Sequence, residues 1–132
     1  MNKNECYTYF VIEGDFNPDT VTEILGLKPS KVRYIGQELR NGRKSDAALW
    51  EFGRCDKYDP LVTNQMEHTV RPLYDKIDVL NKIREIYCVK FCLSVVPTAY
   101  KGNSSPALAP SMEIIDFCHA TRTEIDIDLY IC

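Results

Sequence analysis

Asp126, Asp128 and Tyr130 alternate near the end of the chain and carry the side chains best placed for acid–base or metal chemistry. Alternate residues of a β-strand leave on the same face, so the two carboxylates would lie about 7 Å apart. Such a pair could bind a divalent ion or act as acid and base. The alternative is an acidic stripe that faces solvent, because charged side chains are mostly exposed and no third ligand is evident. We keep these three residues as an alternative ligand site, second to the partner-binding group described below.

The two histidines and six cysteines form no recognisable catalytic or zinc-binding pattern. His119 follows Cys118 directly, but neighbours on a helix point about 100° apart, which excludes a dyad. The chain has no Cys-x-x-Cys, no nucleophile elbow and no glycine-rich phosphate loop. Most of the cysteines lie among apolar neighbours, and we expect reduced structural thiols. The sequence predicts no catalytic residue, no metal site and no cofactor, and it favours a non-enzymatic role.

A group of basic and aromatic residues stands out on a chain whose formal net charge is -3. Its members fall within one expected hairpin and are Arg33, Tyr34, Arg40, Arg43, Lys44 and Trp50. Clustered cations with aromatic neighbours suit an acidic partner or a phosphate-bearing ligand. The alternative is a solvated hairpin tip with Trp50 in the core. We take these six residues as the candidate partner-binding group.

Length and composition indicate one globular domain over residues 1–132, with 45% hydrophobic and 27% charged residues. The negative net charge gives no electrostatic case for nucleic acid. No apolar run approaches the roughly 20 residues that span a bilayer, and the N-terminal residues lack the apolar core of a signal peptide. We expect a cytoplasmic protein with no membrane partner.

The elements that position these residues follow from hydrophobic periodicity. The final segment alternates four aliphatic residues with polar ones, which predicts a strand whose apolar stripe is covered: Ile125, Ile127, Leu129 and Ile131. Residues 6–12 predict a central strand buried on both faces. Asn17-Pro18 predicts a helix start, and Asn41-Gly42 a hairpin turn between strands at 32–35 and 47–52.

A helical pattern covers residues 60–87 and is interrupted by Pro72, which predicts either a kinked helix or two helices in succession. A strand follows at 88–96, where Pro97 ends it or marks an edge. A loop covers 98–109, and a short helix ends near Thr121.

The expected fold class is α+β, with the order β-α-β-β-α-β-α-β. A mixed, mostly antiparallel sheet of roughly four to five strands carries helices mainly on one face. The first six elements have the order of a ferredoxin-like split β-α-β unit.

Several short patterns occur in order along the chain: Gly26-Leu27-x-Pro29-Ser30, then Gly36 and Gly42, then Leu49-Trp50, and the closing residues 124–130. With these patterns the chain resembles the bacterial domain of unknown function 4279 family over nearly its whole length. The resemblance implies a small bacterial, intracellular domain without an established activity, and hence no catalytic residue. It also suggests an association with toxin–immunity or phage-defence loci.

Three functions remain open. The preferred one is a non-enzymatic module that binds another protein, for example as an immunity or antagonist protein. The second is an enzyme or a ligand- or metal-binding domain that uses Asp126, Asp128 and Tyr130. The third is a structural homo-oligomer, such as a homodimer, in which an open sheet edge pairs with its twin.

Overall fold

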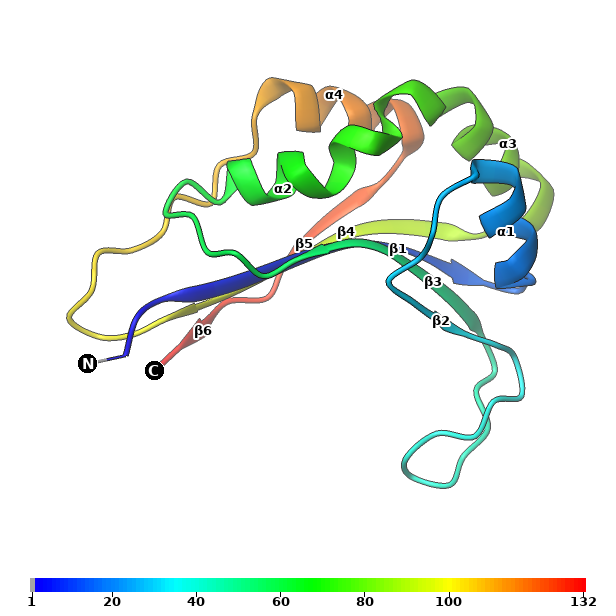
Figure 1. Ribbon diagram of the computed structural model, residues 1–132, viewed down its shortest axis with the longest axis horizontal. Helices are drawn as coiled ribbons and strands as arrows, with labels where there is room; N and C mark the ends of the chain where they lie inside the picture. Colours follow the sequence, from blue (N-terminus) through cyan, green and yellow to red (C-terminus); the bar gives the residue numbers. More distant parts are fainter. Residues whose placement is uncertain (1) are drawn as a thin grey trace.

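The computed structural model describes residues 2–132 (Figure 1). Its strands are β1 (Glu5–Gly14), β2 (Lys31–Arg33), β3 (Ala48–Cys55), β4 (Lys90–Ala99), β5 (Glu124–Ile127) and β6 (Tyr130–Ile131). Its helices are α1 (Pro18–Leu25), α2 (Thr63–Val70), α3 (Ile77–Tyr87) and α4 (Met112–Thr121), and the 3-10 helix η1 (Arg71–Lys76) joins α2 to α3. The predicted α+β class and order of elements are confirmed, with the last strand divided into β5 and β6.

The strands form one open sheet in the order β2-β3-β1-β4-β5, and β6 also pairs with β4. Strands β2, β3, β1 and β4 are antiparallel neighbours, while β5 and β6 run parallel to β4. Strand β3 lies between β1 and β2, as in a split β-α-β unit, so the ferredoxin-like start is confirmed. Strand β1 is central, as its continuous β-branched and aromatic composition predicted.

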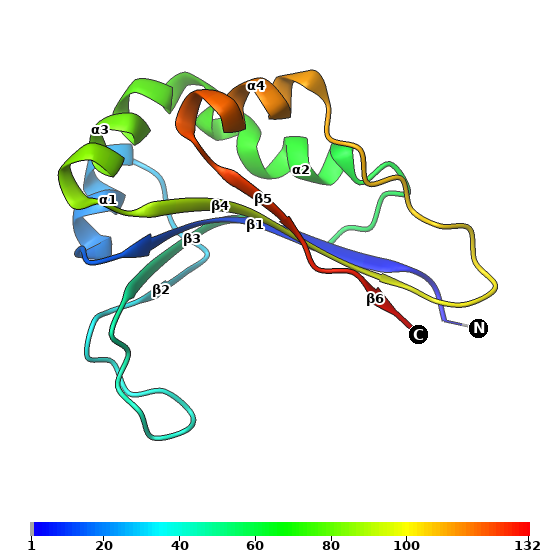
Figure 2. The ribbon, with the colours of Figure 1, turned by 180° about the vertical axis from the view of Figure 1, so that it is seen from behind.

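All the helices among the described residues lie on one face of this sheet (Figures 1 and 2). Every second residue of β1 points toward them and is buried, which gives the strand a core side and an outer side. The largest fully buried side chains come from both layers and are Trp50, Phe10, Phe91, Phe117, Ile12, Met66, Leu73, Leu80, Ile83, Leu93, Ile114 and Val21. Among residues 2–132 no second layer covers the opposite face of the sheet.

Local signals set several helix ends as predicted. The side chain of Asn17 accepts a hydrogen bond of 3.0 Å from the backbone N–H of Asp19, and Pro18 occupies the first turn of α1. Pro72 lies in the first turn of η1, so the helical region is two helices in succession rather than one kinked helix. Pro97, however, lies inside β4, which continues to Ala99.

Helix α2 approaches β3 closely at Gly53. This glycine has φ of +73°, and a Cβ atom there would lie 2.8 Å from the carbonyl oxygen of Thr69. The hydroxyl of Thr69 donates to the Gly53 carbonyl at 2.7 Å and lies 2.7 Å from the hydroxyl of Thr8. Only glycine fits both the backbone conformation and the close contact.

The covered stripe predicted for the final segment is wrong beyond its first residue. Ile125 is half-buried and packs against the core, but Ile127, Leu129 and Ile131 are 38%, 45% and 68% exposed. Strand β5 lies at the sheet edge, and the chain then runs toward the two termini, where no helix lies over it (Figures 1 and 2). Alternation predicted the strand, but coverage depends on where α4 ends.

Candidate partner-binding surface

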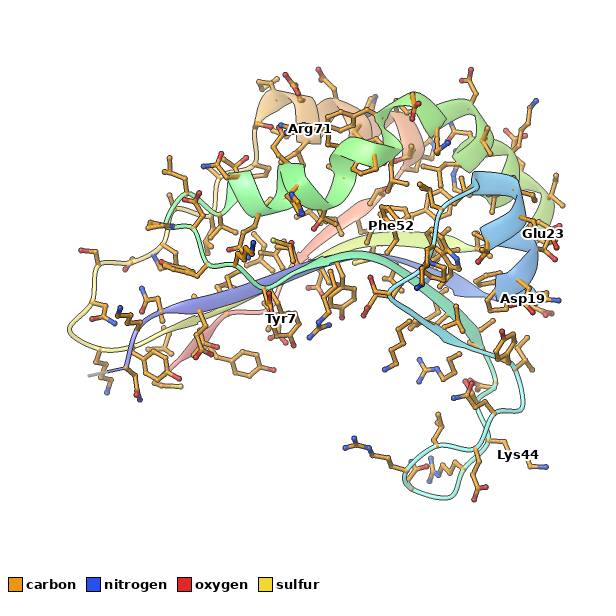
Figure 3. The ribbon with its side chains drawn as sticks, in the orientation of Figure 1. Tyr7, Asp19, Glu23, Lys44, Phe52 and Arg71 are labelled. Carbon is orange, nitrogen blue, oxygen red and sulfur yellow. The ribbon has the colours of Figure 1, made fainter. Side chains whose placement is uncertain are left out.

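The segment of residues 31–47, called here the basic hairpin, projects from the sheet edge on the side away from the helices (Figures 1 and 3). A bridge pairs Glu38 with Lys44, and the predicted turn at Asn41-Gly42 closes it. The N–H of Gly36 donates to the carbonyl of Ser45 at 2.7 Å. Further backbone hydrogen bonds join Leu39 to Arg43 and Ser45 to Gln37. These contacts make the hairpin an ordered arm rather than a loose loop.

The basic hairpin reverses the charge of the chain locally. It holds five Lys or Arg residues against two Asp or Glu residues, which leaves +3 on a chain with a net charge of -3. Arg40, Arg43 and Lys44 are exposed, and Arg33 is half-buried. The structure therefore places five of the six predicted residues, these four and Tyr34, on one arm. Such a local field attracts acidic partners.

Tyr34 anchors the base of the basic hairpin to α1. Its hydroxyl donates a hydrogen bond of 2.7 Å to Asp19, and its side chain remains 41% exposed. This hydrogen bond, followed by burial and the negative charge of Asp19, raises the pKa of Tyr34 above its ordinary value. Tyr34 belongs to the surface but has a positioning contact of its own.

Trp50 does not belong to this surface, which corrects one member of the predicted group. Its side chain is 0% exposed, its ring stacks on Phe52 at 5.6 Å, and its indole N–H donates to the hydroxyl of Thr22 at 3.0 Å. The register of β3 turns Trp50 toward the helices, because it pairs with Ile12 on the core side of β1. Its role is to fill the core beneath α1.

A pocket of about 320 Å³, called here the hairpin pocket, lies between the basic hairpin and the outer side of the sheet. Its lining residues are Glu13, Arg33, Leu39, Asn41, Arg43, Lys44, Ser45, Asp46 and Ala47. Arg33 and Glu13 enter it from β2 and the end of β1, and the others come from the arm and the approach to β3. Three cations and two carboxylates thus meet around one hollow.

The outer side of the sheet carries an aromatic and cationic group that the sequence analysis missed. The rings of Tyr7 and Tyr9 stack with centroids 6.2 Å apart, and the guanidinium of Arg54 lies 4.3 and 5.6 Å from them. Arg54 also pairs with Glu51 at 3.5 Å. Figure 3 shows Tyr7 on the uncovered side of the sheet. The spacing of the two tyrosines, two residues apart, could have indicated that they share one face of the strand. The pair was not identified because the strand was expected to be buried on both faces.

Asp126, Asp128 and Tyr130 are all exposed along the sheet edge. The hydroxyl of Tyr130 donates to Asp128 at 2.9 Å, and this hydrogen bond is the main cause of a raised pKa for Tyr130. Within residues 2–132 no group of three or more His, Cys, Asp or Glu side chains could hold a metal ion. The exposure of all three side chains weighs against an enclosed ligand site built from these residues.

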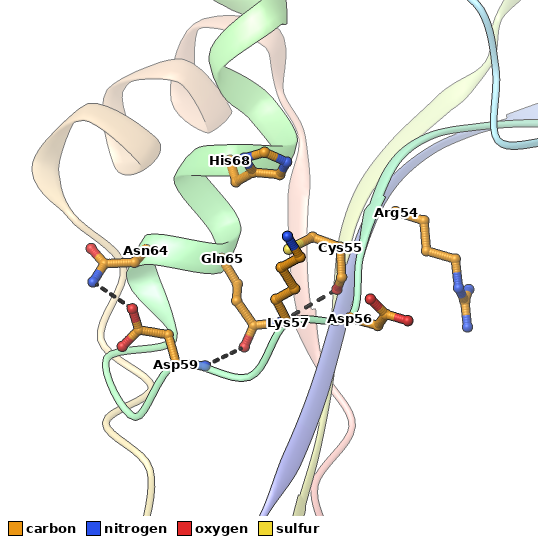
Figure 4. Close-up of a pocket in the computed structure, with 8 residues that line it drawn as sticks. All are labelled: Arg54, Cys55, Asp56, Lys57, Asp59, Asn64, Gln65 and His68. Carbon is orange, nitrogen blue, oxygen red and sulfur yellow. Dashed lines mark hydrogen bonds between the residues drawn. The ribbon is translucent and has the colours of Figure 1, made fainter.

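A second pocket, of about 290 Å³, lies where β3 ends and α2 begins (Figure 4). Among its lining residues are Cys55, Lys57, Asp59, Gln65 and His68. The side-chain amide of Gln65 donates to the Cys6 carbonyl at 2.8 Å, and its oxygen accepts from the N–H of Asp59 at 3.3 Å. Hydrogen bonds from Asn64 and from the Leu61 N–H lower the pKa of Asp59. These polar groups join α2 to β1 and to the connector that precedes α2, which is a structural role.

The cysteines are all free, and their environments differ. Burial raises the pKa of the Cys6 and Cys118 thiols to about 11, which makes them poor nucleophiles. Cys88 is exposed at the left-handed end of α3 rather than in a strand, and Cys132 is exposed at the C-terminus. Among residues 2–132 no hydrogen bond joins a thiol to a histidine.

The fold and surface together define an α+β domain with a ferredoxin-like start, helices on one face of the sheet and a basic hairpin on the other. The chain belongs to the family described as a domain of unknown function, DUF4279, whose model matches residues 4–132. The resemblance inferred from the short patterns is thereby confirmed. Comparisons with the curated proteins and with the solved structures found no match. In the part of the chain that the structure describes, no helix is long and apolar enough to cross a membrane.

Proposed function

We propose that this domain is a non-enzymatic binding module that engages another protein, as an immunity or antagonist protein does. The observation that carries the proposal is the placement of the basic hairpin. It stands on the uncovered side of a sheet whose other side is filled by helices. Arg40, Arg43 and Lys44 make no ion pair within 4.0 Å in the described residues, so their charges remain available to a partner.

The outer tyrosines extend this surface. Tyr7 and Tyr9 are half-exposed beside Arg54, and Tyr and Arg are enriched among the residues that contribute most to protein interfaces. Electrostatic attraction by the basic hairpin would favour encounter with an acidic partner, while the aromatic group would supply contact area. The partner expected from this combination is a protein with an acidic patch and exposed apolar or aromatic residues nearby.

The test is a capture experiment with matched charge reversals. Immobilised wild-type protein is used to find a partner in host extract, and the interaction is repeated with the purified partner. Arg40→Glu, Arg43→Glu and Lys44→Glu together are expected to weaken binding by about a hundredfold or more. The control reverses three exposed lysines elsewhere, Lys28, Lys82 and Lys101, and changes the net charge equally. Equal binding by both triple variants would show that the basic hairpin is not the partner-binding surface.

The immunity role has its own test. Where the partner is toxic to cells, co-expression of the wild-type domain is expected to restore growth, and the hairpin triple variant to fail. If the hairpin triple variant restores growth as well as the wild-type domain does, neutralisation does not depend on the basic hairpin. Failure of the wild-type domain to protect would remove the antagonist role while leaving the binding module to be judged by the capture experiment.

Self-association is a second candidate function, favoured by the outer edge of β5 and β6. This edge exposes Ile127, Leu129 and Ile131, and no further strand of the described residues pairs with it on its outer side. Open apolar edges pair readily with a second copy. Light scattering over a range of concentrations tests it: a dimer that Leu129→Lys disrupts would support the idea, and a monomer at millimolar concentration would exclude it.

A further inference from the structure

The hairpin pocket has the charge and geometry of an anion site. Arg33, Arg43 and Lys44 face it together with the carboxylates of Glu13 and Asp46. None of these five side chains forms an ion pair within 4.0 Å among residues 2–132. Their charges are therefore not neutralised by direct contact, and the lining carries a net charge of +1.

Arg33 provides the sharpest indication. The β2 register pairs it with Leu49, on the outer side of the sheet, and the side chain is half-buried. Its Nε atom is buried and has no hydrogen-bond partner in the described structure. Buried donors are normally satisfied, so the unpaired N–H of Arg33, a residue that lines this pocket, lacks an acceptor that a bound anion could supply. A guanidinium offers its donors as a planar fork that matches a carboxylate or phosphate oxygen pair.

The charge balance distinguishes the two anions. A carboxylate carries one negative charge and would neutralise a lining of +1. A phosphate monoester carries about -1.5 to -2 near pH 7 and would leave excess negative charge beside Glu13 and Asp46. The lining therefore fits a carboxylate better than a phosphate.

The position of the hairpin pocket indicates a peptide as the source of that carboxylate. Strand β2 is the edge strand on this side of the sheet, so an extended segment can lie along it. Lys31 and Arg33 alternate on β2 and share its outer face. An acidic segment running along this edge would meet both cations, with one carboxylate reaching the pocket.

We propose that the hairpin pocket binds an Asp or Glu carboxylate of an acidic peptide segment, with Arg33 as its main contact and Arg43 and Lys44 beside it. This inference deepens the proposed function and rests on it for the identity of the partner as a protein. The contact itself does not require that the partner be known, because a short acidic peptide can test it.

The experiment is a titration of the ¹⁵N-labelled full chain, followed by amide chemical shifts. The probe is a blocked hexaglutamate peptide, and hexaglutamine, acetate and inorganic phosphate are run in parallel. Hexaglutamate is expected to shift the amides of Arg33, Gly42 and Ser45, while hexaglutamine does not. Arg33→Gln should weaken this binding by about tenfold, as expected for loss of charged hydrogen bonds.

Arg40→Gln is the matched control, because Arg40 lies on the same arm and carries the same charge but does not line the hairpin pocket. Arg43→Gln serves as a second lining variant should Arg33→Gln disturb the fold. The proposal is supported if both lining variants weaken binding severalfold more than Arg40→Gln, which removes an equal charge from the arm outside the pocket. Equal losses from all three would overturn it in favour of diffuse attraction.

Two further outcomes would also overturn the carboxylate assignment. Stronger binding of inorganic phosphate than of hexaglutamate or acetate would make the hairpin pocket a phosphate site, and absence of any shift at these amides would remove the site.

The proposed function is judged separately by partner capture. Suppose that the hairpin triple variant loses the partner but hexaglutamate causes no amide shifts in the wild type. The binding module would then stand, and the carboxylate site in the hairpin pocket would be rejected. If the hairpin triple variant still captures the partner while hexaglutamate binds specifically to the wild type, the carboxylate site would stand and the hairpin would be rejected as the partner surface.

Discussion

The hydroxyl of Tyr34 donates a hydrogen bond of 2.7 Å to the carboxylate of Asp19 and so joins the base of the basic hairpin to the first turn of α1. This contact links two segments that flank β2 and helps to aim the arm. Both side chains are exposed, so its effect is local rather than global.

Tyr34→Phe is expected to increase amide hydrogen exchange across residues 35–45 while the thermal midpoint changes little. The matched control is Tyr130→Phe, which removes a similar exposed Tyr–Asp hydrogen bond at the other edge of the sheet. Because the pKa of Tyr34 is raised, its hydrogen bond should persist below the ordinary tyrosine pKa and be lost as pH rises through the raised value. Unchanged exchange in the hairpin would contradict the positioning role.

Gly53→Ala is expected to destabilise the protein by about 2–4 kcal/mol, through a left-handed backbone and a Cβ placed 2.8 Å from the Thr69 carbonyl oxygen. Gly42→Ala isolates the backbone part, because Gly42 has φ of +79° but open space around it. That variant should cost about 1 kcal/mol. Urea unfolding measures both. Similar losses in the two variants would show that α2 can move away from β3.

Ser111→Asp is expected to destabilise α4 although Asp is ordinarily as good an N-cap as Ser. The Ser111 hydroxyl accepts from the N–H of Ile114 at 3.3 Å and also donates to Glu67, a carboxylate whose side chain is 12% exposed. A second carboxylate would face Glu67 without a proton to share. Ser111→Ala should cost about 1–2 kcal/mol, and Ser111→Asp more, by thermal or urea unfolding. The reverse ranking would exclude repulsion by Glu67.

Thiol reactivity should separate the cysteines by burial. Cys88 and Cys132 are expected to react rapidly with a chromogenic disulfide at pH 8, and Cys6 and Cys118 only as the protein unfolds. Rapid modification of all six thiols in folded protein would contradict the burial of Cys6 and Cys118.

The same two thiols predict a dependence of stability on pH. Their pKa is raised from 9.0 to about 11, so the neutral thiol is favoured in the folded state. Their contribution to the free energy of unfolding is complete below pH 9 and is lost as pH rises toward about 11. Replacing Cys6 and Cys118 by Ala should flatten this part of the profile, measured by urea unfolding between pH 8 and pH 11.

Local patterns in the chain were sufficient to predict most elements of the fold. The β-branched and aromatic run of β1, the Asn17-Pro18 helix start and the Asn41-Gly42 turn each act through a few neighbouring residues. Because these preferences depend on backbone conformation and side-chain alternation, they are visible without tertiary contacts. The order of the elements then left few topologies open, since right-handed crossovers and short connections exclude most alternatives.

The candidate surface was predictable only in part. The charges of Arg40, Arg43 and Lys44 around a turn signal exposure by themselves. Trp50 lies close to these basic residues in the sequence, which suggested an exposed aromatic side chain. Its register on β3 instead places it beneath α1. Tyr7 and Tyr9 had the opposite outcome, because the uncovered side of β1 could not be known from the strand alone.

The amino-acid sequence by itself determined that this is an α+β domain, in which order its strands and helices occur, and that a basic arm interrupts an acidic chain. These properties depend on local conformational preference and on charge. Only the tertiary structure decided which face of the sheet stays open, that Ile127 and Leu129 lie beyond the helices, and that Arg33 meets Arg43 and Lys44 around one pocket. The physical reason is that burial and charge proximity depend on contacts between distant segments, which alternation along one strand cannot specify.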